Sequence, residues 1–156
     1  MVSACNKSSS KRVNLNVDKR VSLEDIISLT GVADERRVCA LQVDGKSSVL
    51  MQLKGLEARH PLDYKKLLNV IRLVSQRHEI FNKHVKAGKG RYKGIYEMRG
   101  GQARLFYFLD SSGNAIVVCT NLYWKAKPSR AEQNQAFELC LELRELYRNC
   151  YEIETP

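Results

Sequence analysis

The sequence predicts an α+β fold, in which helices and an antiparallel sheet occupy separate parts of the chain. Three strand-like runs follow one another between about 93 and 124, and apolar residues recur at helical spacing at about 47–76 and 130–148. Gly100-Gly101 and the segment 111–114 (SSGN) separate the three runs, and both are typical of hairpin turns. We therefore expect a three-strand antiparallel meander, packed on a helical hairpin and a C-terminal helix that cover one face of it.

The helical segments carry start signals. One helix is predicted from 47 or 48 to 59, and a second from Pro61 to about 76, because proline suits the first position of a helix. Ser129 and Glu132 have the spacing of a capping box that opens the C-terminal helix. The short connection before Pro61 predicts that the first two helices form a hairpin.

The first 35 residues are predicted to be an extension to the main domain, which spans 36–156. Residues 1–12 are rich in serine and lysine and are expected to be a disordered tail. A short helix is predicted from Val21 to Gly31, since Ser22 and Asp25 resemble a capping box and glycine suits the position after a helix.

Two further segments flank the helical hairpin. Residues 36–43 alternate as a strand does, and the Asp44-Gly45 turn ends the run. Residues 77–92 are basic and contain two glycines, so they are predicted to be a linker.

The composition is that of a globular protein. The chain has 156 residues, of which 44% are hydrophobic and 28% charged, so we expect one domain with its own core. No apolar run reaches the roughly eighteen residues of a membrane span. The N-terminal sequence MVSACNKSSSKR lacks the apolar segment of a signal peptide, so we expect a cytoplasmic protein with no membrane partner.

The charge is strongly positive. The 26 Lys and Arg residues outnumber the 17 Asp and Glu residues, for a formal net charge of +9. Such an excess favours nucleic acid or an acidic protein as partner, and a merely soluble basic protein is the alternative. Acidic residues lie on the C-terminal helix, whereas cations gather around the meander: Lys83, Lys86, Lys89, Arg91, Lys93, Arg99, Arg104, Lys125, Lys127 and Arg130. We expect a polarised surface.

Common catalytic motifs are absent from the sequence. It contains no GxGxxG, GxxxxGK[ST], HExxH or GxSxG pattern. Its five cysteines form no CxxC pair and have no partner histidines at metal-ligand spacing, so neither a metal nor a cofactor is expected. Cys119 and Cys140 are expected to be small buried hydrophobes.

The remaining candidates are the lysines, arginines and tyrosines of the meander. Such side chains can cleave RNA when the ribose 2′-OH attacks its own phosphate, with an acid, a base and cations at hand. Lysine or tyrosine can transfer protons if neighbouring cations depress the pKa, arginine can bind phosphate bidentately, and tyrosine can stack on bases. The alternative is that the aromatic residues are core and the cations a solvated rim. We favour it for Phe106 and Phe108 and leave it open for Arg99, Arg104 and Lys125.

Three motifs follow one another in the meander. They are Tyr96-Glu97-Met98-Arg99, Arg104-Leu105-Phe106-Tyr107 and Tyr123-Trp124-Lys125-Ala126-Lys127-Pro128. In order and spacing this stretch resembles the RelE/HigB toxin superfamily, specifically its phage-derived HigB-like branch. The resemblance covers roughly 36–148. It implies a RelE-like fold and a small toxin of a toxin–antitoxin pair, which cuts messenger RNA on the ribosome and is inhibited by a cognate antitoxin.

The resemblance also implies roles for individual residues. Arg99 and Arg104 would bind or polarise the scissile phosphate, Tyr123 would stack on a base or transfer a proton, and Lys125 completes the implied catalytic set. The residues implied to bind RNA are Lys86, Lys93, Tyr107 and Lys127.

Two other functions remain open. One is a catalytically inactive member of the same fold that binds RNA or protein, because several relatives place a histidine near the C-terminus and none occurs here after His84. The other is a gyrase-inhibiting relative, since that activity shares the fold.

Overall fold

The computed structural model describes residues 19–110, 115–127 and 129–152. The predicted disordered tail at 1–12 and the predicted turn at 111–114 lie outside these residues. The elements in chain order are β1 (Val21–Asp25), β2 (Arg37–Val43), α2 (Ser48–Arg59), α3 (Pro61–Ser75), β3 (Val85–Ala87), the 3₁₀ turn η1 (Gly90–Tyr92), β4 (Ile95–Gly100), β5 (Ala103–Leu109), β6 (Ile116–Trp124), α4 (Arg130–Tyr147) and the π-helical turn η2 (Arg148–Glu152). The α+β class is confirmed.

The strands form one sheet in the order β1-β2-β6-β5-β4-β3. Its centre is the predicted meander, in which β4 pairs antiparallel with β5 and β5 with β6. The sheet is nevertheless mixed, because β2 pairs in parallel with β6, with Arg37 opposite Ile116. This pairing joins the N-terminal half of the chain to the meander.

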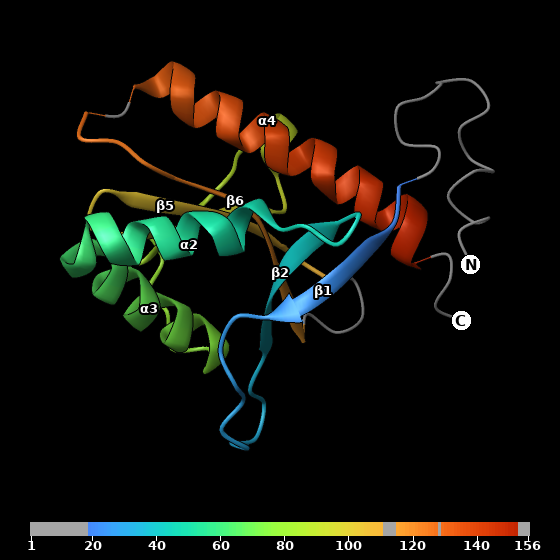
Figure 1. The fold of residues 1–156 in the computed structure, drawn as a ribbon, viewed down its shortest axis with the longest axis horizontal. Helices are drawn as coiled ribbons and strands as arrows, with labels where there is room; N and C mark the ends of the chain where they lie inside the picture. Colours follow the sequence, from blue (N-terminus) through green and yellow to red (C-terminus); the bar gives the residue numbers. More distant parts are fainter. Residues whose placement is uncertain (1–18, 111–114, 128, 153–156) are drawn as a thin grey trace.

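Helices cover both faces of the sheet, so the prediction that they cover one face is wrong. Figure 1 shows α2 and α3 on one side of the strands and α4 on the other. The cause is the two-sided pattern of the meander strands. In β4, Met98 is buried with the α2 and α3 side chains, whereas Ile95 is buried with those of α4. Alternate side chains of a strand point to opposite faces, and here both faces are buried.

The N-terminal segment forms a strand where a helix was predicted. Val21–Asp25 is β1, which pairs antiparallel with β2 at the edge of the sheet. The supposed capping residues make other contacts: the Ser22 hydroxyl donates to Gln42 Oε1 at 2.9 Å, and Asp25 accepts from Arg37 Nε at 2.8 Å. Val21 and Leu23 are partly buried against the α4 side of the core. Alternating burial outweighed the local capping signal.

The predicted linker contains the opposite edge strand. Val85–Ala87 forms β3, which pairs antiparallel with β4, and Val85 is fully buried. Three residues are too few to show an alternating pattern, and the basic composition of the surrounding segment favoured a linker over a strand. The linker prediction is therefore wrong at this point.

The predicted turn at Gly100-Gly101 is shifted by one residue, because Gly100 pairs with Ala103 as the last residue of β4 and the turn is Gly101-Gln102. Several other local predictions are confirmed. Asp44 and Gly45 have positive φ values of 54° and 78° at the turn after β2. Pro61 opens α3, and Ser129 and Glu132 form the capping box of α4. Cys119 and Cys140 are free and fully buried, and burial raises the pKa of Cys140 to about 12.

The Asp63 carboxylate joins three elements at the meander's hairpin end. Its Oδ2 accepts from Trp124 Nε1 at 2.7 Å and from the Gln102 backbone N–H at 3.1 Å. The approach requires glycine at position 101, where φ is +58° and a Cβ would lie 2.0 Å from Asp63 Oδ1. The first turn of α3 is thereby tied to the β4–β5 hairpin and to the end of β6.

The Asp63 contacts predict a pH-dependent stability. The Trp124 hydrogen bond, the Gln102 N–H and nearby cations lower the pKa of Asp63 below its usual 3.8. A depressed folded-state pKa stabilises the fold above about pH 3.8, and this stabilisation is lost as the pH falls through the folded-state pKa. We expect Asp63→Asn to destabilise the protein by about 1 kcal/mol at neutral pH, after allowing for solvent screening. As the pH falls, the difference in the free energy of unfolding between wild type and Asp63→Asn becomes smaller.

Thermal unfolding followed by circular dichroism between about pH 1.5 and 7 measures this effect. Glu142→Gln, at an exposed position of α4, is the matched control and leaves the pH profile unchanged. A difference between wild type and Asp63→Asn that stayed constant across this range would contradict the assignment.

Candidate nucleic-acid interface

Strand register places three predicted site residues side by side. Arg99 on β4 lies opposite Arg104 on β5, and Arg104 lies opposite Tyr123 on β6. Directly opposed residues of neighbouring strands point to the same face, which here is the face covered by α4. The two arginines and the tyrosine thus form a row across the hairpin end of the meander.

A buried carboxylate holds this row together. The Glu97 side chain is fully buried, and its Oε2 accepts from Arg99 Nε at 3.0 Å and from Arg104 Nε at 3.1 Å. Its Oε1 accepts from Gln133 Nε2 on α4 at 2.7 Å. Neither Glu97 nor Gln133 was expected from the sequence to belong to the site. The strand pattern contained a signal for Glu97, since Glu97 and Arg99 are two residues apart on one strand face.

The two guanidinium groups differ in exposure. The Arg104 side chain is 17% exposed, and its Nη1 also donates to the carbonyl oxygens of Gly101 and Ala103. The Arg99 side chain is 32% exposed. Two guanidinium groups share one carboxylate, so the cluster keeps a positive charge next to solvent. A phosphate would meet Arg99 first.

Tyr123 differs from the expectation that cations depress its pKa. Burial raises the pKa of Tyr123 and the Glu97 charge raises it further, while Arg104 and Arg99 lower it by less. The phenol therefore keeps its proton at neutral pH. In this state Tyr123 can donate a hydrogen bond or a proton, and it cannot serve as the general base that a phenolate would be.

Lys125 lies just beyond β6 and is paired with α4. Its Nζ lies 3.1 Å from Glu132 Oε2, and the Lys125 side chain remains half exposed. Glu132 Oε1 also accepts from the Ser129 backbone N–H at the start of the helix. Hydrogen bonding to Lys125 and Ser129 lowers the pKa of Glu132, so its carboxylate is ionised at neutral pH. Lys127, two residues further along the chain, is exposed.

The acidic side of α4 faces part of the cationic surface, which differs from the predicted charge separation. Besides the Lys125–Glu132 pair, Arg91 Nη2 lies 2.6 Å from Glu138 Oε2. These pairs neutralise some of the cations that the sequence placed around the meander.

Of the predicted RNA-binding residues, the lysines are partly or fully exposed and Tyr107 is buried. Lys86 lies opposite Glu97 on the α4 face, and Lys93 is exposed just before β4. Tyr107 is 1% exposed and packs in the core beneath α2 and α3. Burial and the Glu79 charge raise the pKa of its hydroxyl. RNA cannot reach this ring, so the RNA-binding prediction for Tyr107 is wrong.

Two other features of the described residues bear on function. Residues 19–110, 115–127 and 129–152 contain no cluster of three or more His, Cys, Asp or Glu side chains that could hold a metal ion. None of the helices in these ranges is both long and apolar enough to cross a membrane.

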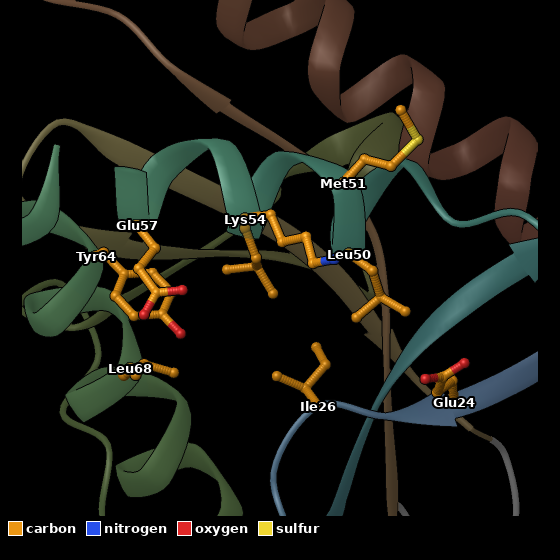
Figure 2. Close-up of a pocket in the computed structure, with 9 residues that line it drawn as sticks. Glu24, Ile26, Leu50, Met51, Lys54, Glu57, Tyr64 and Leu68 are labelled. Atoms are coloured by element: carbon orange, nitrogen blue, oxygen red, sulfur yellow. The ribbon is translucent and has the colours of Figure 1, made fainter. Parts of the chain in front are cut away.

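The aliphatic cavity is the hollow formed by Glu24, Ile26, Leu50, Met51, Leu53, Lys54, Glu57, Tyr64 and Leu68. Its volume is about 400 Å³. Figure 2 shows Ile26, Leu50 and Leu68 converging on it from the end of β1, from α2 and from α3. This hollow lies on the sheet face opposite α4, so it is separate from the row of Arg99, Arg104 and Tyr123.

Comparison with known proteins gives a structural likeness and no match in sequence. No family model matches the sequence, and no curated protein matches it. Among solved structures, a chain of a YoeB–YefM complex from Staphylococcus aureus matches with a TM-score of 0.43 and 15% identity, over 58% of this chain and 97% of that chain. These values are too low to decide family or function. The α+β class rests on the sheet and helices described above.

The Glu97 cluster predicts a large stability difference between two neighbouring substitutions. Glu97→Gln removes the charge that pairs with two partly buried guanidinium groups, and we expect a loss of about 3 kcal/mol in the free energy of unfolding. Gln133→Ala removes one hydrogen bond to the same carboxylate and costs about 1 kcal/mol. Urea denaturation measures both values. Equal losses of free energy in the two variants would show that the ion pairs of Glu97 contribute no more than its hydrogen bond with the Gln133 side-chain amide.

Proposed function

We propose that this chain is a RelE/HigB-like toxin of a toxin–antitoxin pair and cleaves messenger RNA on the ribosome. One observation carries the proposal: strand register brings two guanidinium groups and a protonated phenol together, with Lys125 just beyond the same strand end. These are the groups that phosphodiester cleavage by an internal hydroxyl requires for charge stabilisation and proton donation.

In the proposed reaction the ribose 2′-OH attacks the adjacent phosphorus and loses its proton to water, from which Tyr123 is later reprotonated. A cyclic 2′,3′-phosphate forms as the bond to the 5′-oxygen of the next nucleotide breaks. Arg99 and Arg104 stabilise the charge that develops on the phosphoryl oxygens, through N–H groups that Glu97 does not occupy. Tyr123 donates a proton to the leaving 5′-oxygen, in keeping with its raised pKa. Lys125 adds positive charge at the same end of the sheet.

The proposal assigns the remaining cations to substrate binding. Lys86, Lys93 and Lys127 would contact the RNA backbone, whose phosphates attract a chain of net charge +9. Glu97 and Gln133 are positioning residues, because both are occupied in holding the arginines and α4 together. The protein partner is a cognate antitoxin, and the site of action is the cytoplasm.

An inactive RNA-binding protein is the second candidate. The observation in its favour is that Arg104 is only 17% exposed and is paired with Glu97, as expected for a structural arginine. Such a protein would bind RNA in a salt-dependent manner and leave ribosome-bound message intact.

Expression in a bacterial host tests the proposal. We expect wild type to arrest growth and translation, and Lys125→Ala to lower the rate of message cleavage by about a hundredfold, because it removes an electrostatic stabiliser. Arg104→Lys retains the charge beside Glu97 and loses the planar guanidinium, so we expect a folded protein with a similar loss. Lys65→Ala, at an exposed position of α3, is the control and retains full activity.

Primer extension on message from arrested cells measures cleavage, and thermal unfolding verifies that each variant is folded. Full cleavage by both Lys125→Ala and Arg104→Lys would refute the site. Salt-dependent RNA binding without cleavage by wild type would favour the second candidate.

A further inference from the structure

The edge strand β1 has one row of backbone groups that faces away from the sheet. β1 lies outside β2, and within the described residues no strand lies beyond it (Figure 1). The Asp44 N–H donates to Arg20 O at 2.8 Å, and the Ile26 N–H donates to Val38 O at 2.9 Å. Residues of antiparallel strands bond in alternation, so the even-numbered residues of β1 bond to β2. The residues whose N–H and C=O groups point outward are Val21, Leu23 and Asp25.

The charges along this edge are separated by sign. The run 19–25 reads KRVSLED, with two cations at its start, two carboxylates at its end and Val21, Ser22 and Leu23 between them. Charged side chains on an edge strand usually prevent its pairing with another chain. In this run, however, two antiparallel copies would bring the cations of one beside the carboxylates of the other. The edge is therefore complementary to itself.

Hydrogen bonding and charge favour the same alignment of two copies. The outward backbone groups belong to odd-numbered residues, so odd-numbered residues must lie opposite one another across the contact. An alignment with Ser22 on a two-fold axis meets this condition, and it places Val21 of each copy opposite Leu23 of the other. It also places Arg20 of each copy opposite Glu24 of the other. A shift of two residues keeps the hydrogen bonds and loses these ion pairs.

The side chains of the two ion pairs are accessible. Arg20 and Glu24 are both exposed. Glu24 Oε1 accepts from Gln42 Nε2 at 2.9 Å, which holds the carboxylate beside the edge, and Oε2 can accept from the arginine of a second copy. Asp25 already accepts from Arg37 Nε at 2.8 Å. Arg20 and Glu24 are thus the residues on which the alignment depends most.

The other side of β1 would contribute an apolar contact. Val21 and Leu23 are partly buried against the cluster beneath α4. In the alignment centred on Ser22 they meet their counterparts from the second copy, so this cluster would continue from one copy to the next. The two-fold axis is normal to the sheet, so α4 of both copies lies on the same side. The candidate cleavage site on β4, β5 and β6 lies away from the contact, because β2 separates β1 from β6.

We propose that two copies of this chain associate through their β1 edges, antiparallel and with Ser22 on the two-fold axis, to form one continuous sheet. This inference goes beyond the proposed function, and it holds whether or not the chain cleaves RNA. An edge contact is small, and an exposed ion pair contributes only about 0.2–1 kcal/mol. We therefore expect a reversible dimer with a dissociation constant on the order of 10 μM.

Sedimentation equilibrium of the full chain at neutral pH measures the dissociation constant. Arg20→Glu places two carboxylates opposite each other, and Glu24→Lys places two cations opposite each other. Each substitution should raise the dissociation constant about tenfold or more, because both symmetry-related pairs become repulsive. Lys65→Glu and Glu142→Lys are the matched controls, since they change the net charge equally at exposed positions of α3 and α4. Thermal unfolding verifies that each variant is folded.

Mixing the two variants tests the alignment directly. The Arg20→Glu chain is acidic at positions 20 and 24, whereas the Glu24→Lys chain is basic at both. Each acidic side chain of one variant then faces a basic side chain of the other. An equimolar mixture should therefore form a heterodimer with about the affinity of wild type, although neither variant associates with itself. The double variant Arg20→Glu/Glu24→Lys exchanges the charges and should also form a dimer.

A wild type that stays monomeric at about 100 μM, tenfold above the expected dissociation constant, overturns the proposal and assigns the edge to a different partner. A dimer that Arg20→Glu and Glu24→Lys weaken no more than the controls do also overturns it, because such a dimer forms through another surface. Weakening without recovery in the mixture and in the double variant overturns the alignment centred on Ser22. Weakening in each variant with recovery in the mixture supports the inference, whatever the result of the cleavage assay.

Discussion

The Glu97 carboxylate is the contact on which the candidate site depends. A charge removed from water is strongly unfavourable unless it is paired and hydrogen-bonded, and Glu97 achieves this with donors from β4, β5 and α4. The orientation of two guanidinium groups and a hydrogen bond to α4 therefore depend on the same carboxylate. In this protein the stability of the helix–sheet contact and the geometry of the candidate site cannot be varied independently.

Glu132 repeats this arrangement at the surface. One of its oxygens accepts from the Ser129 backbone N–H at the first turn of α4, and the other contacts the Lys125 ammonium. The carboxylate that starts the helix also positions a cation of the candidate site. This sharing explains why acidic residues on α4 lie close to the basic strand ends, instead of forming a separate acidic surface.

The sequence contained enough information to predict the row of Arg99, Arg104 and Tyr123, because short hairpins and alternating strands fix which residues face one another. The same alternation puts Tyr107 on the face opposite Arg104, because the two are three residues apart on β5. The local pattern did not show that this second face is also buried, beneath α2 and α3. The sequence of β1 fits both a capped helix and an alternating strand, and only its pairing with β2 decides between them.

The parallel pairing of β2 with β6 has a consequence for how the chain reaches this structure. Hairpin contacts within the meander are local and form with little loss of chain entropy, whereas β2 must find a partner far along the chain. During synthesis, the β1–β2 hairpin leaves the ribosome early and has no strand to join until β6 has been made. Until then, the apolar face of this hairpin is either exposed to solvent or covered by other proteins. The chain is therefore most vulnerable to aggregation and proteolysis before the last third of its sequence is complete.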